Sequence, residues 1–234
     1  MSGNTATFKT VSVRRQSTET DFEVILSPRR AAGEPLDLPN RILSHFLDHF
    51  AKASGIAIEV RNTAWPRSWQ FDHVLCEDMG QLIGRGVAAI AAEIVSSKGA
   101  AGRASATCNM DDAVSAVSIT FESRPRCDWR VPRRVDIDGY VDSWYGESGA
   151  VAGTCFGTNL RQFVDGFAYG SGASIGIEVT TAGNLHHLYE TVFRALGDAM
   201  GDSLGTRCTL AGESSGLAGA PQYEVRTDDE IATE

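Results

Sequence analysis

The chain contains an internal duplication, and no other feature of the sequence restricts its fold as strongly. A segment that runs from HFLDHFA to IAIEV occupies residues 45–60, and a similar segment, from QFVDGFA to IGIEV, occupies 162–179. A second match follows in the same order, because HVLCE at 73–77 resembles HHLYE at 186–190. Two matches in the same order indicate that one folding unit occurs twice along the chain.

Both copies show the same order of hydrophobic patterns. Apolar residues alternate over 22–26 and, less regularly, over 114–121, which predicts a half-buried strand upstream of each copy. Within each copy the apolar residues recur at intervals of three and four, then alternate, and then return to the helical interval. The resulting helices are expected at 41–53, 73–95, 158–170 and 186–200. We therefore predict an α+β fold of two β-β-α-β-α half-domains, with the helices on one face of each small sheet.

The two halves are expected to meet at a glycine- and alanine-rich stretch at 99–102. The first half-repeat then covers residues 1–100 and the second covers 101–208. The remaining residues, 209–234, are rich in glycine, serine and acidic residues, which predicts a flexible C-terminal tail.

Charge and cysteine content exclude several classes of function. Twenty-one Lys and Arg against thirty Asp and Glu give a net charge of −9, and no broad basic cluster is present, so nucleic acid is not an expected partner. No stretch reaches the roughly 18 apolar residues of a membrane span, so no membrane association is expected. Five cysteines without a C-x-x-C pair fit neither a disulfide framework nor a cysteine-ligated zinc site. A cytoplasmic protein is therefore predicted.

All five histidines lie within the repeated segments. In both copies of the second helix a histidine stands four residues before a glutamate, as in His73 with Glu77 and His186 with Glu190. This spacing places both side chains on one helical face, where they can offer a nitrogen and an oxygen to one ion. Imidazole and carboxylate without thiolate suit manganese, iron or zinc in an open geometry. One such pair is more often a helix cap or a surface pair, whereas two pairs at matching positions favour a metal.

The chain carries five motifs in an order that is found in a known enzyme family. They are RQSTET at 15–20, ILSHFL at 42–47, DHVLCED at 72–78, MDD at 110–112 with SRP at 123–125, and HHLYETVFRA at 186–195. The family counterparts are R-x-T-x-E-T, F-L-D-H-M-L, D-H-H-T-V-E-D, M-D-D with G-R-P, and H-H-x-x-E-x-x-F-K-A. On these residues the chain resembles the imidazoleglycerol-phosphate dehydratase family over roughly residues 7–205.

The resemblance implies a metal-dependent dehydratase of histidine biosynthesis, which removes water from imidazoleglycerol phosphate with two manganese ions. The residues that keep the ligand type of the family are His45, His73, Glu77, His186, His187 and Glu190. The other two ligand positions hold Val74, which cannot bind a metal, and Gln162, which offers only an amide oxygen. Whether one or two manganese ions bind each chain is therefore left open.

The resemblance also implies roles in catalysis and substrate binding. The candidate catalytic carboxylates are Glu19, Glu77 and Glu190, since a carboxylate can act as a general acid or base. The arginines at positions that bind the substrate phosphate in the family are Arg103, Arg124 and Arg194. A planar guanidinium suits phosphate oxygens. Glu19 could equally be an exposed charge at the end of a strand. Any one arginine taken alone is more simply a solvated surface charge, whereas three at the family spacing favour phosphate.

Two further expectations concern His49 and the assembly. His49 lies one helical turn beyond His45 but has no ligand counterpart in the family, so we expect a partly buried or surface histidine there. The family builds its sites between subunits, and the resemblance therefore implies a homo-oligomer with trimeric contacts.

Three functions are compatible with the sequence. The first is a dehydratase that acts on imidazoleglycerol phosphate and tolerates the altered ligands. The second is a divergent enzyme of the same fold that acts on another imidazole or polyol phosphate. The third is a non-catalytic relative that serves in binding or assembly, because a fold does not determine a function. Metal content distinguishes the third function from the others, and turnover of imidazoleglycerol phosphate distinguishes the first from the second.

Overall fold

The computed structural model describes residues 8–18, 20–29, 36, 38–64, 71–145, 150–206 and 210–214. The elements follow in the order β1 (Val11–Gln16), β2 (Asp21–Pro28), α1 (Arg41–Ser54), β3 (Ile56–Ala64), α2 (Phe71–Lys98), β4 (Arg103–Met110), β5 (Ala113–Phe121), β6 (Arg126–Arg130), β7 (Tyr140–Tyr145), β8 (Ala150–Phe156), α3 (Gly157–Ser171), β9 (Ala173–Thr181) and α4 (Leu185–Leu204). Within the described ranges, no helix combines the length and the apolarity that a membrane span requires. Except for 210–214, the predicted C-terminal tail lies outside the described residues.

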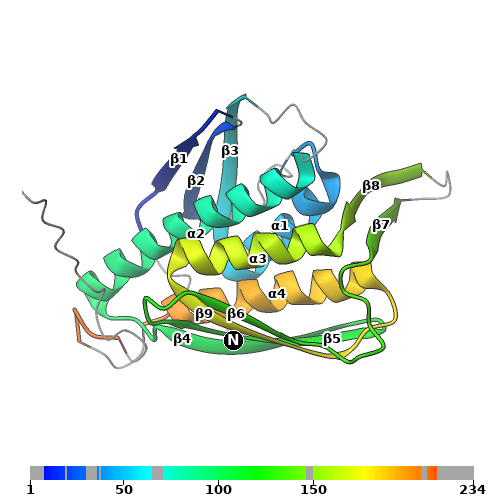
Figure 1. Cartoon of the computed structure of the whole chain (residues 1–234). Coiled ribbons are helices and arrows are strands. Elements are labelled where there is room, and N and C mark those ends of the chain that lie inside the picture. The colour runs from blue at the N-terminus through cyan, green and yellow to red at the C-terminus, as the bar shows by residue number, and fades with distance from the viewer. Residues whose placement is uncertain are drawn as a thin grey trace, which may run out of the picture.

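The two halves build sheets of the same connectivity. β1, β2 and β3 form an antiparallel sheet with β2 in the middle, and β4, β5 and β9 form another with β5 in the middle. The helices lie as a layer between these two sheets, so that each sheet has one face covered by helices (Figure 1). The predicted α+β fold is therefore confirmed.

The second half contains three strands that have no counterpart among the described residues of the first. β6 pairs in parallel with β9 at the edge of the second sheet, and β7 and β8 form a separate two-stranded ribbon. All three lie between β5 and α3, whereas the first half connects β2 to α1 through residues 29–40. The predicted half-domain lacks these strands because a comparison of repeats detects only what both copies share.

The helices pair across the two halves. α1 packs against α4 and α2 packs against α3, so the first helix of each half lies beside the second helix of the other half. Strand alternation turns Phe22, Val24 and Leu26 of β2 into the core that these helices form, and all three are fully buried. Side chains from α1 and α4 therefore form one contact region, and side chains from α2 and α3 form a second.

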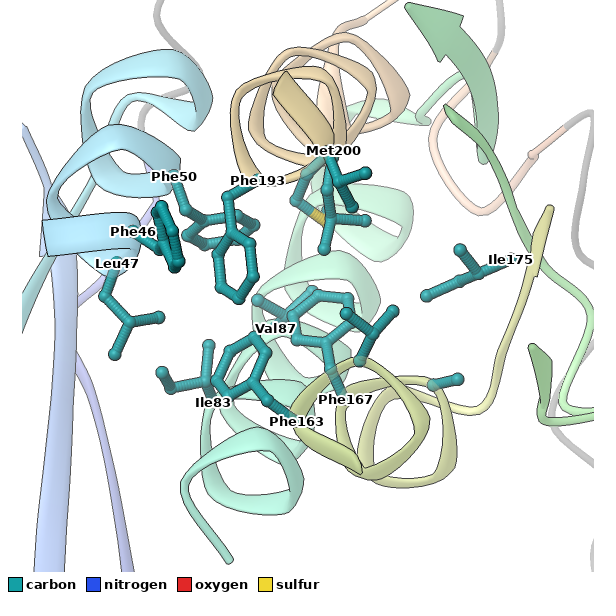
Figure 2. Close-up of a cluster of buried hydrophobic side chains, with 14 of the residues drawn as sticks. Phe46, Leu47, Phe50, Ile83, Val87, Phe163, Phe167, Ile175, Phe193 and Met200 are labelled. Carbon is teal, nitrogen blue, oxygen red and sulfur yellow. The ribbon is translucent and has the colours of Figure 1, made fainter. Parts of the chain in front are cut away.

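Aromatic side chains from the helices form the centre of the core (Figure 2). Phe46 of α1 and Phe163 of α3 both stack on Phe193 of α4, with ring centroids 5.3 and 5.1 Å apart. Phe50 meets Phe167 edge to face at 5.8 Å. All five rings are fully buried, and each contributes about 1.5–3 kcal/mol from burial alone. This cluster holds α1, α3 and α4 at fixed positions relative to one another.

Asparagine side chains cap the starts of α1 and α4, and a glycine ends α1. The side chain of Asn40 accepts a backbone hydrogen bond at the start of α1, and that of Asn184 accepts one from the backbone of His186, at 2.7 Å, at the start of α4. α1 ends at Gly55, whose φ of 72° is accessible to glycine without a steric penalty. Because α4 begins at this cap, His186 lies in its first turn.

The hydroxyl of Tyr189 joins α4 to the segment between β6 and β7 and to the first residue of α3. The oxygen lies 2.7 Å from the carbonyl oxygen of Ile137 and 3.0 Å from that of Gly157, and the ring is fully buried. Burial raises the pKa of this hydroxyl, so it stays protonated and can donate. We expect Tyr189→Phe to lower the free energy of unfolding by about 2 kcal/mol, because buried carbonyls lose their donor. Urea unfolding measures this loss.

The matched control for this prediction is Tyr169→Phe, which removes the same oxygen from a side chain that is 62% exposed. Its effect on the free energy of unfolding is expected to stay within about 0.5 kcal/mol. Equal losses in the two variants would contradict the role given to the Tyr189 hydroxyl.

Candidate metal centre

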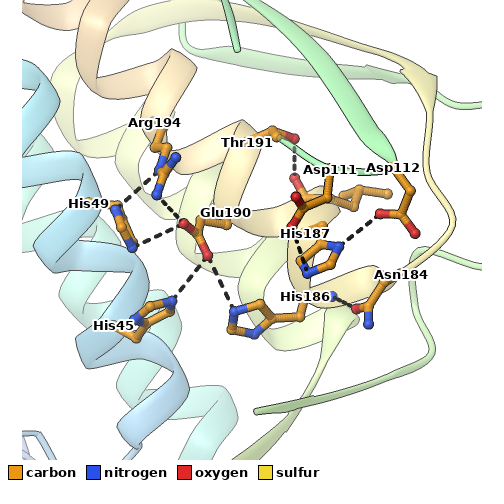
Figure 3. Close-up of polar contacts among 11 residues, drawn as sticks. His45, His49, Asp111, Asp112, Asn184, His186, His187, Glu190, Thr191 and Arg194 are labelled. Atoms are coloured by element: carbon orange, nitrogen blue, oxygen red, sulfur yellow. Dashed lines mark hydrogen bonds and ion pairs between the residues drawn. The ribbon is translucent and has the colours of Figure 1, made fainter. Parts of the chain in front are cut away.

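Three imidazoles surround one buried carboxylate, that of Glu190 on α4 (Figure 3). The Nε2 atoms of His45 and His186 lie 3.2 and 3.3 Å from the Oε2 atom of Glu190. The Nε2 atom of His49 lies 3.1 Å from the other carboxylate oxygen, Oε1. Both oxygens of the carboxylate thus lie next to imidazole nitrogens, and imidazole nitrogen is a common metal ligand.

Helix periodicity and helix pairing bring these residues together. His45 and His49 are one turn apart on α1, and His186, Glu190 and Arg194 are successive turns of α4. Residues four apart share one face of a helix, and α1 packs against α4 along these faces. The rings of His45 and His186 stack with centroids 5.1 Å apart. The cluster is therefore assembled from residues that are 145 positions apart in the chain.

Arg194 neutralises the charge of the cluster. Its Nη2 atom contacts Oε1 of Glu190, and its Nε–H donates to Nδ1 of His49 at 3.1 Å. Burial by itself disfavours the Glu190 carboxylate. Hydrogen bonds from His186 and His45, together with the positive charge of Arg194, outweigh this penalty and hold the pKa of Glu190 well below its usual range. Glu190 is therefore ionised at neutral pH.

His49 is neutral in this arrangement. Burial, followed by the nearby Arg194 and His45, lowers its pKa to about 4, against the raising effect of Glu190. Because Nδ1 accepts from Arg194, the ring proton is on Nε2, which donates to Glu190. Neutral imidazole is the form that binds metal ions.

The chemistry of this cluster fits a divalent metal ion. The ligand atoms of His45, His49 and Glu190 all lie within 4.8 Å of one another. His186 adds a third imidazole, and its Nδ1 atom is buried without a hydrogen-bond partner among the described residues. Nitrogen and carboxylate oxygen without thiolate are the donors that manganese, iron and zinc accept in open sites. These four residues could hold one ion.

A second cluster lies at the equivalent place in the other helix pair. His73 Nε2 of α2 lies 3.6 Å from Oε2 of Glu77, and His73 Nδ1 donates to Oε1 of Gln162 on α3. Gln81 donates to Glu77 at 3.2 Å. Gln162 occupies the position of His45 in the repeat, so this cluster has one imidazole where the first has three. The side chains of His73 and Glu77 are each 45% exposed, so this second cluster is also more open to solvent.

His187 joins neither cluster within the chain. Its Nδ1 atom lies 2.8 Å from Oδ1 of Asp112, and its Nε2 atom lies 3.5 Å from Oδ2 of Asp111. Both aspartates belong to the turn between β4 and β5, where Asp111 has a φ of 47°. His187 is thus held by this turn rather than by Glu190. Its role as a metal ligand remains a prediction from the sequence.

The three predicted phosphate-binding arginines do not gather in one chain. Arg194 lies at the first cluster and beside Cys108 of β4. Arg103 begins β4, where it pairs with Thr120 of β5. It lies five residues before Cys108 on β4, which corresponds to about 17 Å along a strand. Arg124 follows β5 at that same end, and both Arg103 and Arg124 are exposed. The phosphate-binding roles of the three arginines remain predictions.

His49 is the residue that sequence reasoning missed. The sequence places it one helical turn beyond His45, on the same face of α1. The resemblance gives this position no ligand role, and the second copy of the repeat has Gly166 there, so neither comparison indicates a ligand. Glu19, another predicted site residue, lies outside the described residues.

Comparisons with known proteins agree with this fold. A family model described as imidazoleglycerol-phosphate dehydratase (IGPD) matches residues 39–200. Among curated relatives, the imidazoleglycerol-phosphate dehydratase of Burkholderia multivorans is 30% identical over 193 residues, which are 82% of this chain and 89% of that protein. The enzyme of the same name from Ralstonia nicotianae is 29% identical over 189 residues, which are 80% of this chain and 86% of that protein.

Solved structures give the same result. IGPD from Pyrococcus furiosus, in complex with (S)-C348, has a TM-score of 0.64 and 27% identity, and the match covers 88% of this chain and 99% of that chain. Imidazoleglycerol-phosphate dehydratase from Staphylococcus aureus shares the fold, with a TM-score of 0.60 at 18% identity over 84% of this chain and 99% of that chain. Because the family model spans more than half of the sequence, this chain belongs to the imidazoleglycerol-phosphate dehydratase family, whose members are hydro-lyases.

Proposed function

We propose that the chain is a manganese-dependent dehydratase of histidine biosynthesis that removes water from imidazoleglycerol phosphate. The observation that carries this proposal is the buried carboxylate of Glu190 with imidazoles on both of its oxygens, contributed by two helices. A solvent-exposed ion pair would not need three histidines around one carboxylate. Membership of the dehydratase family supplies the reaction and the substrate.

We assign His45, His49, His186 and Glu190 as the protein ligands of one manganese ion. Manganese held there would act as a Lewis acid, which withdraws electron density from the imidazole ring of the substrate and favours loss of a proton from carbon. The depressed pKa of Glu190 supports a ligand role rather than an acid role, because its carboxylate stays ionised and is a weak base.

Proton transfer is assigned to more accessible groups. The carboxylate of Glu77 and the ring of His73 are each 45% exposed and lie within 3.6 Å of each other, so both can reach a substrate from solvent. Glu19 is the other candidate, on the sequence motif alone. In a dehydration, one group removes the proton from carbon and another donates a proton to the departing hydroxyl, so two groups are required.

The second cluster is proposed as a weaker metal site or none. Gln162 replaces an imidazole by an amide oxygen, and His73 and Glu77 are more exposed to water than the members of the first cluster. His73 and Glu77 with the neutral amide of Gln162 are expected to bind a transition metal more weakly than three imidazoles and a buried carboxylate. We therefore expect one tightly bound manganese ion per chain.

The substrate phosphate is assigned to Arg194, Arg103 and Arg124. Because Arg103 starts β4 while Arg194 lies beside Cys108 further along the same strand, one chain does not bring them together. This separation supports a homo-oligomer with trimeric contacts, in which a neighbouring subunit supplies the distant arginines. The free thiols among the described cysteines support a reducing, cytoplasmic location.

Turnover of imidazoleglycerol phosphate tests the proposal. We expect the protein loaded with manganese to dehydrate this substrate, to lose activity when a chelator removes the metal, and to regain it when manganese is returned. A protein that binds manganese but leaves imidazoleglycerol phosphate unchanged would favour a different phosphorylated substrate. A protein that binds no metal would favour the non-catalytic relative.

A further inference from the structure

Arg194 makes the contacts that a cation bound to the first cluster would make. Its guanidinium touches Oε1 of Glu190, the same oxygen that lies 3.1 Å from Nε2 of His49. Its Nε–H also holds Nδ1 of His49 at 3.1 Å. One side of the cluster is therefore already occupied by a positive charge that belongs to the chain (Figure 3).

We propose that Arg194 is a resident counter-ion that a divalent metal displaces, and that the binding of metal and the binding of phosphate are positively coupled through it. The inference rests on the proposed function in one respect, namely that Arg194 is a phosphate ligand. It adds that metal and phosphate favour each other's binding. The metal competes with Arg194 for Glu190 and His49, and phosphate competes with Glu190 and His49 for Arg194.

The physical reason is competition between two cations for one carboxylate. A metal on Glu190 would stand next to the Arg194 guanidinium, and the two positive charges repel strongly in a partly buried site. The metal can therefore take Oε1 only when Arg194 leaves. The Arg194 side chain is 35% exposed, whereas that of Glu190 is 6% exposed, so the guanidinium has a path to solvent. Outside the cluster its planar donors are free for phosphate oxygens.

The same exchange prepares His49 to bind the metal. While Arg194 donates to Nδ1, the ring proton is on Nε2, which leaves no lone pair for an ion on that nitrogen. Departure of Arg194 frees Nδ1 to take the proton, and Nε2 then has its lone pair available. The ring stays neutral and no proton is gained or lost. Phosphate on Arg194 thus favours metal binding, and by reciprocity the metal favours phosphate.

Manganese binding to the full chain, with and without inorganic phosphate, tests the coupling. Electron paramagnetic resonance of free Mn²⁺ reports the bound fraction and needs no turnover. We expect phosphate to tighten manganese binding about tenfold in the unaltered protein, which is within the usual range of coupling between sites. Phosphate also complexes manganese in solution and lowers the free Mn²⁺ signal, so a protein-free titration at the same phosphate concentration is subtracted.

The decisive variant is Arg194→Gln. Removal of the competing cation should tighten manganese binding about tenfold without phosphate, and phosphate should have no further effect. Arg194→Lys keeps one positive charge but not the planar donors that contact Glu190 and His49 together, so a smaller phosphate effect is expected.

Arg14→Gln is the control, because Arg14 pairs with Asp21 on the first sheet and is 57% exposed. It should behave like the unaltered protein.

Weaker manganese binding in Arg194→Gln with an unchanged thermal melt, or a phosphate effect that persists in this variant, would overturn the coupling. If Arg194→Gln fails to fold, the same two readings are taken on Arg194→Lys, and an undiminished phosphate effect there overturns it. A protein that dehydrates its substrate without the coupling would leave the proposed function intact and refute only this inference. Absence of any manganese binding would refute both.

Discussion

Replacing Glu190 by glutamine will abolish tight manganese binding and lower the rate of dehydration by about 1,000-fold or more. The carboxylate is the only anionic group among the four assigned ligands, and it lies among three imidazoles. An amide keeps the volume but removes the charge that attracts a dication. Manganese content after gel filtration and steady-state turnover measure the two effects.

Two matched variants show whether the loss belongs to this carboxylate. Glu178→Gln makes the same chemical change at an exposed position on β9 and should keep full metal content and rate. Glu77→Gln changes the second cluster, so we expect it to keep the tightly bound ion and to lose activity. Arg194 loses its carboxylate partner in Glu190→Gln, and a thermal melt therefore accompanies each sample. One ion per chain and an unchanged rate in Glu190→Gln would show that the ligand assignment is wrong.

Gly80→Ala is expected to lower the free energy of unfolding by about 4 kcal/mol or to prevent folding. A Cβ at Gly80 of α2 would overlap the backbone carbonyl oxygen of Phe163 on α3. The same close approach recurs along the crossing, since a Cβ at Gly84 would lie 2.5 Å from the oxygen of Phe167 and one at Gly166 would lie 2.6 Å from that of Glu77. Backbone cannot move aside as a flexible side chain can, so the helices must separate and lose packing.

Urea unfolding of Gly80→Ala and Arg85→Ala compares this interface with an exposed site on the same helix. Arg85 is exposed on α2, and its replacement should change the free energy of unfolding by less than about 0.5 kcal/mol. Alanine is the better helix former, so propensity alone would make Gly80→Ala stabilising by about 1 kcal/mol. A stabilised Gly80→Ala variant would mean that α2 and α3 lie further apart than the structure places them.

Much of the fold follows from local patterns in the sequence. The spacing of apolar residues over 41–53 and 186–200 marks the helices that became α1 and α4, and the repeat predicts their order. The strands β6, β7 and β8 escaped this reasoning because the described part of the first half holds no second copy of them. A pattern that occurs once gives no internal comparison, and short strands carry a weak periodic signal.

The sequence by itself determined the duplication, the α+β class and the pairing of a histidine with a glutamate on one face of each second helix. Only the tertiary structure decided which helices meet. The packing of α1 on α4 brings His49 to Glu190, a contact between residues that no local pattern connects. The same packing leaves Arg103 far from Arg194. Helix periodicity depends on neighbours within a few residues, whereas the pairing of helices depends on the fit of side chains from distant parts of the chain.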